Sequence, residues 1–156
     1  MNKIEIPFRL PSLNQYINEC RRNKYAGANM KKNVEKDIGW YINLLPTYKN
    51  PIKIHFIWVE ENKRRDLDNV CFAKKFILDS MVKAGKLKDD NRNFVKGFRD
   101  DFEYGKSSKV ILEIEEIKWK ELKNMLLGMF IGAMLGVMMM CLVFCAKDKE
   151  EENDSK

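Results

Sequence analysis

Apolar and polar residues alternate, or recur at helical spacing, over most of the first 117 residues of this 156-residue chain. β-Branched and aromatic runs predict strands at residues 2–8, 52–60, 94–102 and 110–116. Apolar residues three and four apart predict helices at residues 31–45 and 69–84, and the polar segment 10–29 indicates an extended loop. The order β-α-β-α-β-β predicts a small mixed-sheet domain of the α/β or α+β class, at residues 1–120.

The second predicted helix has identifiable ends and an apolar face. Asp68 stands where an N-cap residue accepts hydrogen bonds from the first turn, and Gly85 stands where a helix ends in a left-handed residue. We expect its apolar face to belong to the core together with Trp58 of the second strand; that face includes Phe76, Ile77 and Met81.

A different pattern begins near residue 121. Residues 125–146 carry no charge, and at about 1.5 Å per residue they are long enough to cross a hydrocarbon core of about 30 Å. They predict one transmembrane helix after a juxtamembrane segment that starts at residue 121, with a buried core helix as the alternative. Residues 147–156 are acidic and predicted to be disordered. Lysines before the span favour a cytoplasmic domain with the N-terminus inside; they are Lys118, Lys120 and Lys123.

Basic residues predominate in residues 1–120, which hold 25 Lys and Arg against 17 Asp and Glu, a net charge of +8. Such a domain attracts polyanions, although nucleic acid and an anionic membrane surface give the same signal. His55 has no other His or Cys at ligand spacing, and the four cysteines form no CxxC pair, so a zinc site and a disulfide framework are not expected. Residues 1–15 lack the apolar run of a signal peptide, which favours the cytoplasm.

The basic residues include a group near the N-terminus that is interleaved with Tyr16 and Tyr25. Lysines and arginines bind phosphates, and aromatic rings stack on unpaired bases, so a DNA-binding loop is one interpretation and a flexible charged loop is the other. The predicted DNA-binding residues are Arg21, Arg22, Lys24, Lys31, Lys32, Arg64, Arg65 and Lys74.

Two carboxylates, Asp66 and Asp68, lie between the second strand and the second helix. In an extended segment, side chains two residues apart project to the same side, where two carboxylates repel unless a cation neutralises them. Mg²⁺ prefers such oxygen ligands and keeps waters. Asp90, or its neighbour Asp89, is the third candidate ligand beyond the helix. Capping and solvated turns are the alternative, but the basic residues next to the pair favour phosphodiester chemistry.

Several short motifs together resemble the RusA family of Holliday junction resolvases, many of them phage-encoded. The resemblance covers about residues 3–117. It rests on Pro11-Ser12-Leu13-Asn14, Arg64-Arg65-Asp66-Leu67-Asp68-Asn69, Lys75, Asp79, Lys83-Ala84-Gly85 and Leu87-Lys88-Asp89-Asp90.

The resemblance implies a homodimeric endonuclease that binds four-way DNA junctions and cuts two strands symmetrically with Mg²⁺ or Mn²⁺. It carries the catalytic, metal-binding acids over to Asp66, Asp68 and Asp90. Counting back from the Lys83-Ala84-Gly85 motif places the family's lysine at Lys75. The helix region is about one turn longer than in the best-known member, which leaves Lys74 open.

Other interpretations stay open at this point. A non-catalytic basic module that binds DNA and is tethered to the membrane needs only the charge and the apolar segment. A basic domain that binds anionic lipids is a third, opposed by the acidic pair. The chain from Met125 onward resembles very small single-span phage proteins, so fused reading frames and a membrane tether both explain it.

Overall fold

A computed structural model describes residues 1–117 and 119–154, without the side chains of residues 119–122, 125 and 142–154. The chain divides into two units, Met1–Ile117 and Lys118–Lys156. The first is a mixed α/β domain, as the sequence predicts, and it holds all of the candidate site residues.

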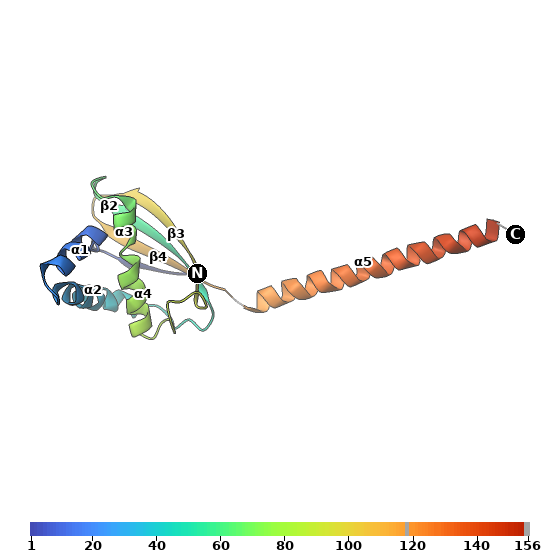
Figure 1. The fold of residues 1–156 in the computed structure, drawn as a ribbon, viewed down its shortest axis with the longest axis horizontal. Helices are drawn as coiled ribbons and strands as arrows, with labels where there is room; N and C mark the ends of the chain where they lie inside the picture. Colours follow the sequence, from blue (N-terminus) through green and yellow to red (C-terminus); the bar gives the residue numbers. More distant parts are fainter. Residues whose placement is uncertain (118, 155–156) are drawn as a thin grey trace. The chain divides into compact units, whose positions relative to one another are not determined.

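The first unit is built on a four-stranded sheet with the order β1-β4-β2-β3 (Figure 1). β2 pairs parallel with β3 and antiparallel with β4, and β4 pairs antiparallel with β1. A short turn joins β3 to β4, although β2 lies between these two strands in the sheet. The N–H of Gly105 in this turn donates to the carbonyl of Glu60, the last residue of β2, at 3.1 Å. The strands are β1 Asn2–Ile6, β2 Ile52–Glu60, β3 Val95–Tyr104 and β4 Lys109–Glu116.

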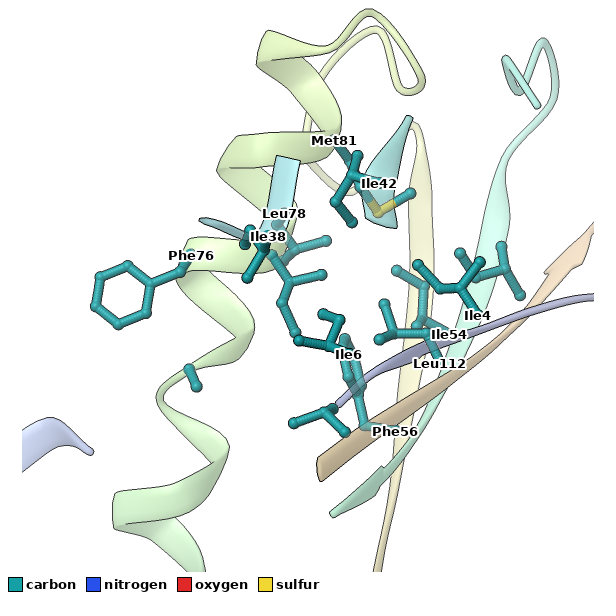
Figure 2. Packing of buried hydrophobic residues seen from close by; sticks show 14 of the residues in the cluster. Ile4, Ile6, Ile38, Ile42, Ile54, Phe56, Phe76, Leu78, Met81 and Leu112 are labelled. Atoms are coloured by element: carbon teal, nitrogen blue, oxygen red, sulfur yellow. The ribbon is translucent and has the colours of Figure 1, made fainter. Parts of the chain in front are cut away.

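Four helices cover one face of this sheet (Figure 1). They are α1 Leu13–Arg22, α2 Ala26–Ile42, α3 Leu67–Cys71 and α4 Lys74–Lys83. Figure 2 shows side chains of α2 and α4, among them Ile38 and Met81, directed at strand residues such as Ile6, Phe56 and Leu112. Trp58 is also buried, as are the three apolar α4 residues expected in the core.

The predicted loop at residues 10–29 is wrong, because α1 lies within it. Ser12 caps this helix: its hydroxyl accepts from the backbone N–H of Gln15, whose side chain accepts from the Ser12 N–H at 2.8 Å. This capping box is a local signal that the polar composition concealed. α2 also starts earlier than predicted, since the Asn23 side chain accepts from the N–H of Ala26.

The helix predicted at residues 69–84 is two helices with a tight joint at Phe72 and Ala73. Around the joint, N–H groups donate to carbonyls three residues back, for example Lys75 to Phe72 at 3.0 Å. Such bonds tighten a helix locally. α4 then ends as predicted at Gly85, whose φ is 66°.

The end of α4 gives a direct test of backbone conformation. The N–H of Gly85 donates to the carbonyl of Val82, and that of Lys86 donates to Met81, which together form a Schellman motif. Nothing lies near a Cβ built on Gly85, so Gly85→Ala should cost only the left-handed strain, about 1–2 kcal/mol. Denaturant unfolding measures this cost, and an equal loss in Gly85→Asn, which tolerates the conformation better, would contradict the assignment.

The open face of the sheet carries a row of charges across all four strands. Lys3 donates to Glu113 at 3.0 Å, and Arg99 lies 2.9 Å from Asp101. The two ring nitrogens of His55 lie 3.1 Å from Glu113 and 2.8 Å from Asp101. Carboxylates only accept hydrogen bonds, so both contacts are satisfied at once when the imidazole is protonated.

This row makes the fold sensitive to acid. The hydrogen bond from His55 lowers the pKa of Asp101, and the one from Lys3, aided by His55, lowers the pKa of Glu113. Groups with lowered folded-state pKa values stabilise the fold above their unfolded pKa, and this contribution is lost as the pH falls through the folded value. The unfolding free energy should therefore fall below about pH 4. The double variant Asp101→Asn/Glu113→Gln should show a shallower fall in denaturant titrations; an unchanged slope would contradict it.

The second unit contains one helix, α5 Trp119–Asp154, which includes residues 147–154, predicted to be a disordered tail. Lysine and glutamate, frequent in that tail, have high helix propensity. The predicted transmembrane span 125–146 lies in α5, but the side chains of residues 125 and 142–146 are outside those described. Among the described residues, no helix has the length and apolar character needed to cross a membrane.

Candidate functional site

The predicted acidic pair lies where the chain passes from β2 to α3. Asp66 is the N-cap residue of α3, with an extended backbone, and Asp68 lies in the first helical turn. This corrects two predictions, because Asp66 and not Asp68 holds the cap position and only Asp66 is extended. The reason is that the helix begins at Leu67, two residues earlier than expected. Both carboxylates are exposed, and among the described residues Asp66 accepts a long side-chain hydrogen bond, 3.4 Å, from Asn69.

Two other predicted residues, Lys75 and Asp90, meet although fifteen positions separate them. The Lys75 ammonium lies 3.0 Å from Asp90 in the loop after α4, and 2.8 Å from Asp79 one turn along α4. Hydrogen bonds to Asp79 and then to Asp90 raise the pKa of Lys75. The carboxylate of Asp89 instead accepts from the backbone N–H of Asp90 and from Asn91 within the loop. The structure therefore favours Asp90 over Asp89 as the residue that faces α4.

Behind Lys75 runs a chain of alternating charges between α2 and α4. Lys31 lies 2.5 Å from Asp79 and 3.7 Å from the buried Glu35, which also pairs with Lys83. Burial acts to raise the pKa of Asp79, but the hydrogen bonds from Lys31 and Lys75 outweigh it, so the pKa is lowered. Lys31, predicted to bind DNA, is thus part of the support of Lys75.

Lys74, the neighbouring lysine, points to a different partner. Its ammonium lies 2.7 Å from Asp100 on β3 and over the rings of Phe56 and Phe98. The second oxygen of Asp100 accepts from the Trp58 indole N–H at 2.8 Å. Sequence reasoning missed Asp100, because only the register of β3 beside β2 brings it under the helices.

The thiol of Cys71, in α3, is affected by the carboxylates of both Asp68 and Asp100. Burial, followed by the charge of Asp100, raises the pKa of its thiol to about 11, with a further contribution from Asp68 and an opposing one from Lys74. The thiol is therefore un-ionised at neutral pH and acts as a small polar side chain and not as a nucleophile. The charges of Asp68, Asp100 and Lys74 all act on this thiol, which lies at the end of α3.

The predicted convergence of Asp66, Asp68 and Asp90 on one ion is not present in the described part of the chain. No group of three or more His, Cys, Asp or Glu among the described residues is close enough to hold a metal ion. The exposed oxygens of Asp66 and Asp68 nevertheless suit Mg²⁺, which binds through one or two carboxylates and takes substrate phosphate and waters as its other ligands. The donor set fits a metal whose other ligands are phosphate oxygens and waters.

The residues predicted to bind DNA differ in their exposure and in the contacts that their side chains already make. Arg65 is mostly buried and donates to Glu60 at 2.8 Å and to the Leu10 carbonyl at 3.0 Å, which gives it a structural role. Tyr16 packs on the rings of Phe72 and Phe76. Arg22 pairs with Glu19, and Lys24 lies over Tyr25. Arg21, Lys32 and Arg64 are exposed and make no ion pair with any described residue.

Comparison with known proteins adds no assignment. No protein-family model matches the chain, and no curated protein matches it. The resemblance to the RusA family therefore stays a prediction that rests on the motifs.

Proposed function

We propose that this chain is a Mg²⁺-dependent endonuclease that cleaves branched DNA, with four-way junctions as its substrate. The observation that carries the proposal is the ion pair between Lys75 and Asp90. Both were candidates from sequence motifs, and the fold joins them at the first turn of α4, just beyond the short helix that bears Asp68.

In this proposal Asp66 and Asp68 hold the metal, and Asp90 is the third candidate ligand. A bound Mg²⁺ would lower the pKa of a water and neutralise charge on the scissile phosphate. The Lys75 ammonium pairs with Asp90 in the absence of DNA. Its half-exposed position lets it stabilise phosphate charge when DNA is bound. Mn²⁺, with the same preference for oxygen, should replace Mg²⁺.

The substrate class follows from charge and symmetry. The net charge of +8 in residues 1–120 favours DNA through release of counterions, and the exposed Arg21, Lys32 and Arg64 are available for phosphates. A four-way junction has two equivalent strands to cut, so a homodimer with one site in each copy matches it. Both features belong to the proposal.

The test is cleavage of a synthetic four-way junction by the full chain, with and without Mg²⁺. Paired nicks that require the metal and spare linear duplex are expected. A chain that binds junctions but cuts nothing in Mg²⁺ or Mn²⁺ would overturn the proposal.

One observation favours a second candidate, a non-catalytic DNA-binding module. The net charge of +8 in residues 1–120 suffices for DNA binding and needs no metal site. This candidate predicts equal affinity for junction and duplex DNA, with no loss of any activity in Asp66→Ala. Metal-dependent cleavage that is lost in Asp66→Ala would exclude it.

A further inference from the structure

Asp100 occupies an unusual place for a carboxylate. It lies in register with Phe56, so it shares the face of the sheet that the helices cover. Its side chain is only 22% exposed, and both of its oxygens accept hydrogen bonds, one from the Trp58 indole and one from the Lys74 ammonium. Trp58 itself is buried, so Asp100 is anchored to the rigid part of the sheet.

Both helices at the joint meet this carboxylate. Lys74 is the first residue of α4, and Cys71, whose thiol pKa Asp100 helps to raise, is the last residue of α3. Asp68 lies one turn before Cys71 on the same short helix. α3 has only five residues, so its direction depends on what holds its end.

We propose that Asp100 is a positioning residue of the site: by holding Lys74 against β3 it sets the joint between α3 and α4, and with it the direction in which α3 presents Asp68. The inference rests on the proposed function, because Asp68 is taken there as a metal ligand. Asp100 does not touch the metal or DNA in this role. It acts on the acidic pair through the helix that bears Asp68, as partners of metal ligands do in other sites.

Replacement of Asp100 by asparagine separates its two hydrogen bonds. The amide has one oxygen, so it can accept from Trp58 or from Lys74 but not from both, and its NH₂ group would face the remaining donor. Asp100→Glu keeps the charge but moves it by one methylene. A role in positioning predicts that both variants are impaired, whereas a role of charge alone predicts that Asp100→Glu is not.

The next residue, Asp101, supplies a matched control. It is on the same strand and loses the same charge on change to asparagine, but it lies on the opposite face, where it contacts His55 and Arg99. The sheet therefore separates Asp101 from the acidic pair and the helices. Asp101→Asn therefore corrects for loss of one negative charge and for a local change in β3.

The experiment measures Mn²⁺ affinity by electron paramagnetic resonance on the full chain, alone and with bound duplex DNA, and then kcat and KM for junction cleavage. We expect Asp100→Asn to weaken Mn²⁺ binding by about 10- to 100-fold, and to lower kcat with little change in KM. Asp101→Asn should remain within about twofold of the wild type, since a change away from ligands and their supports has small effects. Unfolding curves establish that each variant is folded.

Equal Mn²⁺ affinity and kcat in Asp100→Asn and Asp101→Asn would overturn the inference and leave the proposed function intact. If Asp100→Asn does not fold, Asp100→Glu decides: weaker Mn²⁺ binding supports the inference, and unchanged binding overturns it. A wild-type chain that neither binds Mn²⁺ nor cuts junctions overturns the proposed function, and the inference with it.

Discussion

Asp68→Asn should reduce junction cleavage by at least about 10²- to 10³-fold, the loss typical of removing one group that stabilises charge in a transition state. Asp68 is exposed in the first turn of α3 and makes no ion pair with any described residue. The substitution therefore removes a proposed metal ligand without leaving a buried partner unpaired. Junction affinity should stay the same or increase slightly, because one negative charge near the phosphates disappears.

Asp37→Asn is the control for this change. Asp37 is an exposed carboxylate on α2, so the variant has the same change in net charge at a distance from the acidic pair. Single-turnover cleavage and binding in Ca²⁺, which takes the same oxygen ligands, separate catalysis from affinity. Equal cleavage rates for Asp68→Asn and Asp37→Asn would remove Asp68 from the site.

Trp58→Ala should lower the unfolding free energy by about 3–5 kcal/mol, the range for loss of a buried large aromatic side chain. Trp58 is 2% exposed and stacks on Phe56 with ring centroids 5.4 Å apart. The change leaves a cavity between the sheet and the helices and removes the indole donor of Asp100. This loss is a large part of the total stability of a domain, about 5–15 kcal/mol.

Trp40→Ala makes a control of the same residue type. Trp40 lies on α2 and is 79% exposed, so its loss should change stability by no more than about 0.5 kcal/mol. Urea unfolding of both variants followed by circular dichroism measures the difference. Similar losses in the two variants would show that Trp58 is not packed as described.

The sequence predicted the strands best. β2 was expected at residues 52–60 and is found at Ile52–Glu60, because its run of β-branched and aromatic residues is bounded by a proline and a charged segment. α1 was missed because its ten residues lie in a segment rich in asparagine and arginine, a composition typical of loops. The capping box at Ser12 was the local signal that could have revealed the helix. The joint inside residues 69–84 was missed because apolar spacing continues through it.

For the site, the sequence selected candidate residues, but the contacts between them came from the fold. Motifs selected Asp66, Asp68, Lys75 and Asp90 as candidates, and the fold joined only the last two by a direct contact. Arg65 was selected for phosphate binding, but its guanidinium is used by Glu60 and Leu10. Local sequence cannot distinguish an arginine that faces solvent from one whose guanidinium holds two segments together, because the same side chain serves both purposes.

The sequence by itself determined the fold class, the strands and the apolar faces of α2 and α4, because the period of apolar residues records which side of each element is buried. Only the tertiary structure decided which charged residues meet. The parallel register of β3 beside β2 brings Asp100 to Trp58 and Lys74, and the turn at Gly85 returns the chain so that Asp90 reaches Lys75. These contacts join residues from separate elements, and their geometry depends on how those elements pack, which no local pattern contains.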